Sequence, residues 1–357
     1  MQRDDIDTPA LLLDLDRVER NIATMASFAA DRNTGLRPHF KTPKCPEIAR
    51  LQLAAGALGI TCAKLGEAEV LADAGIGASV LIANQVIGAQ KLERLAALAG
   101  RLPELIVAVD HPDQVAALEA VLLGTSARLG ALIEVDSGMH RCGTRSPDET
   151  RLLAQRLVES SIEYRGVMGY EGHAVLVADA AKRKSLAEAA LAELRLHVEA
   201  LRDAGLPPEI VSAGGTGTHD ITGEAPFVTE LQVGSYVFMD GAYRKVRGEF
   251  ECALSLVTTI VHVRGRLLIT DCGMKALSHE FGMPEGATLP LRCVGLSEEH
   301  GHVLVDEGAD LGLGVGDRIE ILPSHGDTTI NLHEQYYALR GDEVEAVWPI
   351  AARGRFR

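Results

Sequence analysis

The feature that most constrains the fold of this chain is a repeated alternation of short apolar segments and helical segments between residues 36 and 238. Eight apolar segments of four to eight residues are separated by polar turns and, in most cases, by alanine- and leucine-rich stretches of helical periodicity. Parallel strands joined by helical crossovers produce this pattern. The predicted strands are 36–40, 59–62, 80–83, 105–109, 129–135, 164–170, 209–212 and 231–238.

Eight parallel strands within some 205 residues are the count and length of a TIM (β/α)8 barrel, with an open doubly wound sheet as the alternative. After residue 245 the sequence pattern changes to segments of alternating apolar and polar residues, rich in β-branched side chains and separated by turns rich in Gly, Asp and His. We therefore predict an α/β protein with a TIM barrel over residues 16–244. A mainly β C-terminal domain, made of residues 1–15 and 245–357, follows it and is expected to include the N-terminal strand 8–15.

The same patterns predict individual elements of both domains. Asp16 is expected to cap the first helix, which runs to about Asp31. Further helices are expected at 64–74, 87–100, 112–124, 148–159 and 180–204. Further strands are expected at 254–263, 266–270, 289–294, 302–305, 318–322 and 343–349.

The composition excludes several classes of function. A net charge of −15 argues against nucleic acid or an anionic membrane as a partner, because both need a basic footprint. The six cysteines have no repeating spacing, so neither a disulfide framework nor a zinc finger is expected. The N-terminus lacks the apolar core of a signal peptide, and no apolar run approaches the roughly 18 residues that span a bilayer. We expect a soluble, cytoplasmic protein.

A lysine at the expected end of the first barrel strand is the first candidate for chemistry. Lys41 follows His39 and Phe40, at the point where the strand should end and a helix begin. Active sites of TIM barrels lie at the C-terminal ends of the strands, so this amine is well placed to act on a ligand. A single lysine is more often a solvated surface charge. Three motifs later in the chain favour the catalytic interpretation instead.

One glycine-containing segment follows the seventh expected strand and another lies within or just after the eighth, where TIM barrels often bind phosphate. Glycine lets backbone N–H groups approach a phosphate closely, and threonine and serine add hydroxyl donors. The first turn, 212–218, has neither the spacing of a dinucleotide-binding fingerprint nor that of a Walker loop. The expected phosphate-binding residues are Gly215, Thr216, Gly217, Gly234, Ser235 and Tyr236.

Two more residues at strand ends are candidates for contact with a cofactor ring. Arg141 lies between two glycines after the fifth strand, where its guanidinium can donate to a phenolate oxygen. A salt bridge to Asp136 is the alternative role of this arginine. Tyr170 follows the sixth strand and is placed either to border a ring or to pack in the barrel.

The third motif is His325-Gly326-Asp327, near the C-terminus. In an extended segment, residues two apart point to the same face, so His325 and Asp327 can share one metal ion. Imidazole nitrogen and carboxylate oxygen suit Mn²⁺, Zn²⁺ or a similar divalent ion, and two protein ligands leave positions open for substrate and water. A His-x-Asp pair by itself is common and usually has no function.

Together the motifs describe a phosphate site and a metal site around an amine. An amine that forms a Schiff base beside a phosphate cradle is the arrangement expected for pyridoxal 5'-phosphate. We therefore predict pyridoxal phosphate and a divalent metal as cofactors, with Lys41 and His325 as catalytic residues and an amino acid as substrate.

The chain resembles the D-threonine aldolase and D-serine dehydratase group of fold-type III pyridoxal phosphate enzymes, whose barrel is related to that of alanine racemase. The resemblance runs over essentially the whole chain. It implies Lys41 as the Schiff-base lysine, His325 and Asp327 as metal ligands, and a homodimer with active sites near the subunit interface. The matching segments are Pro9–Asp14, Arg37–Thr42, Asp136–Gly143, Gly169–Gly172, Ser212–Gly217, Gly234–Asp240, His325–His333 and Val347–Gly354.

Within this group the aldolases tend to carry His-x-Asp at the metal position and the dehydratases His-x-Cys. Asp327 therefore favours an aldolase that cleaves D-3-hydroxy amino acids to glycine and an aldehyde, with manganese as the metal and Mg, Co or Zn as alternatives. A D-serine or 3-hydroxyaspartate dehydratase and a 3-hydroxy-D-aspartate aldolase are the alternatives within the group. A non-catalytic pyridoxal phosphate-binding protein and a metal-dependent barrel hydrolase are alternatives of other classes.

Overall fold

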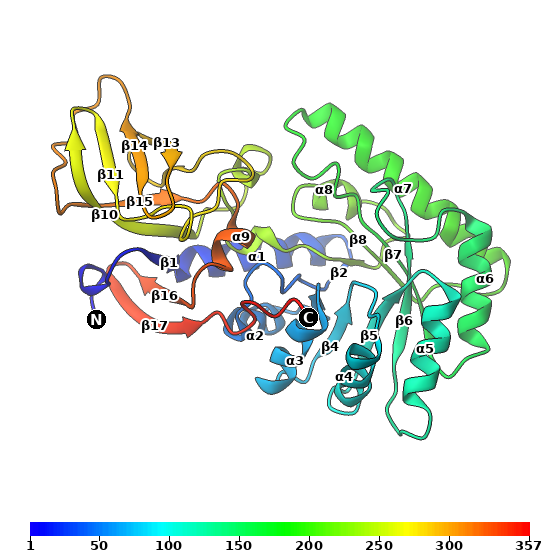
Figure 1. Ribbon diagram of the computed structural model, residues 1–357. Coiled ribbons are helices and arrows are strands. Elements are labelled where there is room, and N and C mark those ends of the chain that lie inside the picture. The colour runs from blue at the N-terminus through cyan, green and yellow to red at the C-terminus, as the bar shows by residue number, and fades with distance from the viewer. The chain divides into compact units, whose positions relative to one another are not determined.

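The computed structural model describes residues 1–357 and divides into two compact units (Figure 1). One contains a parallel sheet and is called the barrel unit below; the other contains an antiparallel sheet and is called the β unit. No helix is both long and apolar enough to cross a membrane. The barrel unit consists of residues 25–41, 48–234 and 355–357, and the β unit of residues 1–24, 42–47 and 235–354.

The parallel sheet of the barrel unit has eight strands in the order β2-β9-β8-β7-β6-β5-β4-β3. Its two ends meet, because His39, just after β2, forms a parallel bridge with Thr61 of β3, and the Phe40 amide donates to the Thr61 carbonyl at 2.7 Å. The predicted TIM-type barrel is confirmed as a nearly closed barrel. The strands are β2 (Gly35–Leu36), β3 (Gly59–Cys62), β4 (Ser79–Ile82), β5 (Leu105–Val109), β6 (Gly130–Val135), β7 (Glu163–Gly169), β8 (Ile210–Ala213) and β9 (Glu230–Leu231).

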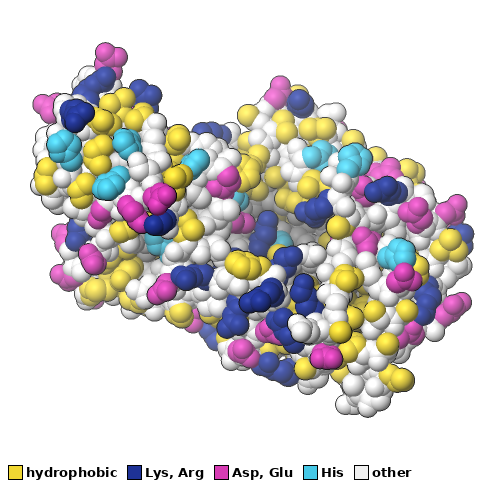
Figure 2. Space-filling model, in the orientation of Figure 1, with side chains coloured by type: hydrophobic (Ala, Val, Ile, Leu, Met, Phe, Trp, Pro, Cys, Tyr) yellow, Lys and Arg dark blue, Asp and Glu magenta, His cyan; other side chains and the backbone are white.

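The helices follow the predicted periodicity, and α4 to α7 lie along the outside of the strands (Figure 1). Three of them begin at a side chain that accepts from a free N–H of the first turn: His111 before α5, Ser146 before α6 and Asp179 before α7. Figure 2 shows charged side chains of both signs scattered over these helices. The helices are α1 (Leu15–Asp31), α2 (Pro46–Ala54), α3 (Leu65–Asp73), α4 (Ala89–Ala99), α5 (Pro112–Leu122), α6 (Pro147–Val158), α7 (Ala180–Asp203) and α8 (His219–Thr222).

The core of the barrel consists of apolar side chains from neighbouring strands. Every residue of β5 and of β6 is buried, because strands of a parallel sheet are covered on both faces. This burial explains why the strands appear in the sequence as continuous apolar runs rather than as alternating patterns. One buried cluster joins five adjacent strands and consists of Leu81, Ile106, Ala108, Leu132, Met168 and Ile210.

A buried ion pair lies where the barrel closes. Arg37 follows β2, Glu230 begins β9, and their side chains are 4% and 2% exposed. The Arg37 Nε atom donates to Glu230 Oε1 at 2.9 Å, and an Nη1 atom donates to the Ser79 hydroxyl at 2.7 Å. These contacts tie three strands of the barrel together, and they satisfy charges that would otherwise be costly to bury.

The sheet of the β unit has nine strands in the order β11-β14-β13-β12-β15-β10-β1-β16-β17. The strand β1 (Ala10–Asp14) pairs antiparallel with β10 and parallel with β16, so the expected pairing of the N-terminal strand with the C-terminal part of the chain is found. The other strands are β10 (Leu254–Arg264), β11 (Leu267–Thr270), β12 (Glu285–Gly286), β13 (Leu291–Leu296), β14 (Gly301–Val305), β15 (Arg318–Leu322), β16 (Gln335–Arg340) and β17 (Glu343–Pro349).

Two predicted strands are much shorter in the structure than in the sequence pattern. Of the run 36–40, only Leu36 lies in a strand, β2. The apolar run 231–238 contributes only β9, which ends at Leu231. Residues Ser235–Val237 form a 3-10 turn instead, whose Ser235 carbonyl accepts from the Phe238 amide at 3.3 Å and also from the Met239 amide at 2.7 Å. The run is apolar because it is buried in either conformation, so its composition does not distinguish a strand from a buried turn.

We predict that Glu230→Gln lowers the free energy of unfolding by about 3–5 kcal/mol, because it leaves the buried guanidinium of Arg37 without its charge partner. The matched control is Glu199→Gln, which breaks an exposed pair with Arg195 on α7 and should change the free energy by less than about 0.5 kcal/mol. Urea denaturation of both variants measures the two values. Equal losses would show that the buried pair has no special role.

Candidate functional site

The predicted cofactor residues of the barrel unit lie at one end of the barrel. Lys41 follows β2, Arg141 follows β6, Tyr170 directly follows β7, the turn beginning at Gly214 directly follows β8, and Gly234 follows β9. Parallel strands all end at the same edge of their sheet, so these residues come from five loops at the C-terminal end. This is the end at which TIM barrels carry out chemistry.

The segment around Lys41 is held by the bridge that closes the barrel. The Lys41 amide donates to His39 Nδ1 at 3.4 Å, Phe40 is buried, and the lysine itself is half-buried. The next residue, Thr42, is 1% exposed, and its hydroxyl has no hydrogen-bond partner in the protein. A buried hydroxyl without a partner costs about 1–3 kcal/mol, so this position is suited to a polar group supplied from outside the chain.

The glycine turn after β8 is packed too closely for side chains. All residues from 212 to 218 are buried. A Cβ atom at Gly217 would lie 1.8 Å from the Val175 carbonyl oxygen, and one at Gly215 would lie 3.0 Å from Cε2 of Tyr170. The tyrosine ring therefore lies directly beside the turn, and the structure brings these two predicted elements of the site together. Glycine, backbone amides and a threonine hydroxyl form a donor set suited to phosphate.

The predicted alternative salt bridge between Arg141 and Asp136 is not present in the structure. Its guanidinium lies 3.6 Å from Glu134 at the end of β6, whereas Asp136 accepts from the amides of Gly138 and His140. The Arg141 side chain is 56% exposed, so it is available to a ligand at the barrel end.

Glu134 was not singled out in the sequence, although the structure places it beside a predicted site residue. Gln85, after β4, donates to its Oε2 atom at 2.6 Å. Burial raises the pKa of Glu134, while the hydrogen bond from Gln85 and the charge of Arg141 act in the opposite direction. No local motif marks this residue, because its partners come from other loops.

Ser235 and Tyr236 belong to the β unit, directly after Gly234. Both are buried, and they form the 3-10 turn that replaces the end of the predicted strand. The Tyr236 ring packs edge-on against Phe250, with 5.8 Å between the ring centroids. The structure thus fixes this tyrosine by an aromatic contact as well as by its turn.

His325 and Asp327 lie together in the β unit, with 3.9 Å between Nε2 and Oδ2. Two ligands that each lie about 2.1 Å from a metal ion are at most about 4.2 Å apart, so this pair fits one divalent ion. The expectation of an extended segment is wrong, since only His325 is extended and Asp327 lies in the first turn of the helix α9 (Gly326–Ile330). A helix forms because Asp240 accepts from the Gly326 amide at 3.1 Å, which satisfies a free N–H of its first turn.

Asp240 also holds the imidazole of His325, a role that no pattern in the sequence indicated. Its Oδ2 atom lies 2.8 Å from Nδ1 of the ring, and a carboxylate can only accept, so Nδ1 carries the proton. In a neutral ring with this tautomer, the lone pair of Nε2 faces Asp327. A carboxylate bound to the second ring nitrogen is the usual support of a metal-binding histidine. No group of three or more His, Cys, Asp and Glu side chains is arranged to hold a metal ion.

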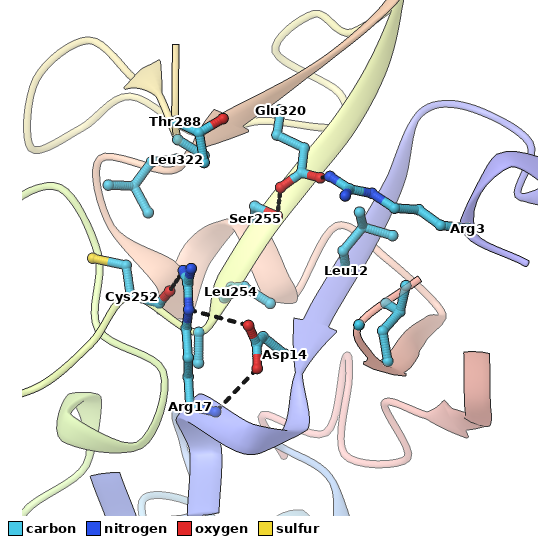
Figure 3. A pocket seen from close by; sticks show the side chains of 14 residues that line it. Arg3, Leu12, Asp14, Arg17, Cys252, Leu254, Ser255, Thr288, Glu320 and Leu322 are labelled. Atoms are coloured by element: carbon cyan, nitrogen blue, oxygen red, sulfur yellow. Dashed lines mark hydrogen bonds and ion pairs between the residues drawn. The ribbon is translucent and has the colours of Figure 1, made fainter. Parts of the chain in front are cut away.

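A separate cavity of about 160 Å³ lies within the β unit (Figure 3). Arg17 donates to the Cys252 carbonyl at 2.8 Å and pairs with Asp14, while Glu320 pairs with Arg3. Burial raises the pKa of the Cys252 thiol to about 11, so it is not a thiolate at neutral pH. Each charged side chain in this cavity has an opposite charge beside it, and none of the predicted catalytic, cofactor-binding or metal-binding residues lines it.

Comparison with known proteins identifies the family of the chain. The family model "Alanine racemase, N-terminal domain" matches residues 13–241, and the family model "Putative serine dehydratase domain" matches residues 253–339. The chain belongs to the D-threonine aldolase and D-serine dehydratase family of fold-type III enzymes. The resemblance predicted from the motifs is thereby confirmed, and the chain is a pyridoxal phosphate-dependent lyase.

Similar members of the family have more than one activity. A 3-hydroxy-D-aspartate aldolase of Paracoccus denitrificans is 34% identical over 99% of this chain and 94% of its own length. A D-threo-3-hydroxyaspartate dehydratase of a Delftia species is 32% identical over 96% of this chain and 97% of its own length. The crystal structure of a D-threonine aldolase from Filomicrobium marinum has a TM-score of 0.94 and 38% identity, covering 98% of this chain and 96% of that one.

We predict that Gly217→Ala greatly weakens the binding of pyridoxal phosphate, because the new methyl group would overlap the Val175 carbonyl and displace the turn. Gly77→Ala is the matched control, since a Cβ there meets nothing within 4 Å. Titration of the two cofactor-free variants with pyridoxal phosphate, followed by visible absorbance, compares them. Unchanged affinity in Gly217→Ala would show that the turn does not contact the cofactor.

Proposed function

We propose that this protein is a metal-assisted D-threonine-type aldolase, which cleaves D-3-hydroxy amino acids to glycine and an aldehyde. The observation that carries the proposal is the pair formed by His325 and Asp327, in which the second ligand is a carboxylate rather than a thiolate. The D-threonine aldolase structure, similar along almost the whole chain, supports the same activity.

The barrel unit would hold the cofactor through residues at the C-terminal ends of its strands. Pyridoxal phosphate, when bound, withdraws electrons from the α-carbon of an amino acid. Lys41 would supply the amine that holds it, Arg141 would donate to the ring oxygen, and Tyr170 would border the ring. The phosphate would be bound by Gly215, Thr216, Gly217, Gly234, Ser235 and Tyr236.

The β unit would hold the metal. A divalent ion, when bound, lowers the pKa of a hydroxyl group that coordinates it. His325 would donate Nε2 and Asp327 a carboxylate oxygen, while Asp240 keeps the imidazole in the required tautomer. The mixed nitrogen and oxygen set favours manganese, with Mg, Co or Zn as alternatives. We further propose that the protein acts as a homodimer.

The second candidate within the same family is a dehydratase of D-serine or 3-hydroxyaspartate. It is supported by the dehydratase from Delftia, which is similar along almost the whole chain. The substrate is a separate question, because a 3-hydroxy-D-aspartate aldolase is also among the relatives. An additional cation would have to bind the second carboxylate of a 3-hydroxyaspartate.

Incubation of the purified protein with D-threonine and Mn²⁺, with and without EDTA, tests the proposed reaction. We expect glycine to form in the presence of the metal and its formation to stop when EDTA removes it. Separate assays of glycine and 2-oxobutanoate distinguish the two reactions of the family. Metal-dependent 2-oxobutanoate without glycine would identify a dehydratase and would refute the inference from Asp327.

Lys41→Ala should remove both the visible absorbance of the covalently held cofactor and turnover, because the variant lacks the amine that would hold the cofactor. Lys91→Ala, an exposed lysine on α4, is the control and should behave like the wild type. Absorbance spectra and the glycine assay provide the two measurements. Activity near the wild-type level in Lys41→Ala would overturn the assignment of this lysine.

A further inference from the structure

Glu171 is a buried carboxylate beside the turn to which we assign the cofactor phosphate. It follows Tyr170 in the loop after β7, and its side chain is 2% exposed. A carboxylate is costly to bury unless donors surround it, so the partners of Glu171 indicate its role.

All the side-chain partners of Glu171 belong to the segment from Gly214 to the end of α8. The Oε1 atom accepts from the hydroxyl of Thr218 at 2.7 Å and from that of Thr222, and both threonines are fully buried. The Oε2 atom accepts from the Gly214 amide at 3.3 Å. One carboxylate therefore fastens both ends of the segment that contains the glycine turn.

Thr218 links the carboxylate of Glu171 to Gly215, the residue of the turn that follows Gly214. Its hydroxyl, which donates to Glu171, also lies 3.3 Å from the Gly215 amide and accepts from it. Its own amide donates to the Gly215 carbonyl at 3.1 Å. The amides of Gly214 and Gly215 are thus directed to Glu171 and Thr218, and Thr216 and Gly217 form the tip of the turn.

We propose that Glu171 is a positioning residue for the cofactor phosphate, which acts by fixing the conformation of the turn from Gly214 to Thr218. The proposal rests on the assignment of the phosphate to this turn. A carboxylate and a phosphate repel each other, so Glu171 acts on the phosphate through the turn and not by contact. Because Tyr170 precedes Glu171 and packs against Gly215, the same loop also sets the place of the tyrosine ring relative to the turn.

Glu171→Gln tests the proposal with little change of shape. The amide oxygen of glutamine can accept from the two threonines, but the NH₂ group then faces the Gly214 N–H and cannot accept from it. We expect the affinity for pyridoxal phosphate to fall about tenfold to a hundredfold, as for the loss of hydrogen bonds to a charged group.

The decisive measurement compares two ligands of the full-length, cofactor-free protein. Pyridoxal shares the ring and the aldehyde of pyridoxal phosphate and lacks only the phosphate group. If Glu171 acts through the phosphate turn, Glu171→Gln should strongly raise the dissociation constant of pyridoxal phosphate. The dissociation constant of pyridoxal should change by less than about threefold. Equal weakening of both ligands, or no weakening of either, would overturn the proposal.

A second pair of variants keeps the proposal testable if Glu171→Gln folds poorly. Thr218→Val removes the hydroxyl that joins Glu171 to Gly215 and should show the same selective loss of pyridoxal phosphate binding. Thr218→Ser retains the hydroxyl and should restore binding to near the wild-type level. If Thr218→Ser bound pyridoxal phosphate as weakly as Thr218→Val, the result would count against the hydrogen-bonded link between Glu171 and Gly215.

Thr258→Val is the matched control, because Thr258 is also fully buried and donates to a carboxylate, that of Asp271 in the β unit. It should lower stability without changing the preference for pyridoxal phosphate over pyridoxal. Binding of both ligands to the wild type distinguishes a failure of the phosphate assignment from a failure of the role of Glu171. Equal binding of both ligands by the wild type would refute the phosphate site itself, whereas normal wild-type preference with an unselective Glu171→Gln would refute only the role of Glu171.

Discussion

Parallel strands in a closed sheet must all end at the same edge, and the candidate site depends on this constraint. The barrel closes through one bridge between His39 and Thr61, and the buried side chain of Arg37 donates to Ser79 across the same seam. The residue that follows the bridge by two positions is Lys41. Closure of the barrel and placement of the candidate amine are therefore the consequence of one short segment, and five loops that are distant in the sequence meet at that end.

The fold was largely predictable because its signals are periodic and repeated. Strands such as Leu105–Val109 and helices such as Ala180–Asp203 have the predicted bounds to within a residue. The failures are local. The apolar run after Leu231 turns instead of extending, and Asp327 lies in a helix that begins only because Asp240, 87 residues earlier, accepts from its first turn. Neither conformation is encoded by periodicity within the segment itself.

The position of a candidate site residue was predictable where its residue type suggests a chemical role and it lies next to a strand end, as for Lys41, Arg141 and the glycine turn. Supporting residues such as Glu134 and Asp240 could not be found in this way. An acidic residue has many possible roles, and its function follows from donors that the fold brings to it from other loops. In a chain with 50 acidic residues, no single carboxylate stands out without those donors.

The close packing of Gly217 against Val175 and of Gly215 against Tyr170 has a consequence for how such an enzyme can change its substrate. Few substitutions fit in this part of the chain, because each would move a neighbouring backbone or ring. Variation in substrate range among relatives, or in a laboratory library, therefore has more room in loops without such contacts. A library that leaves the two glycines and the loop of Glu171 constant would contain a larger share of folded, cofactor-binding members.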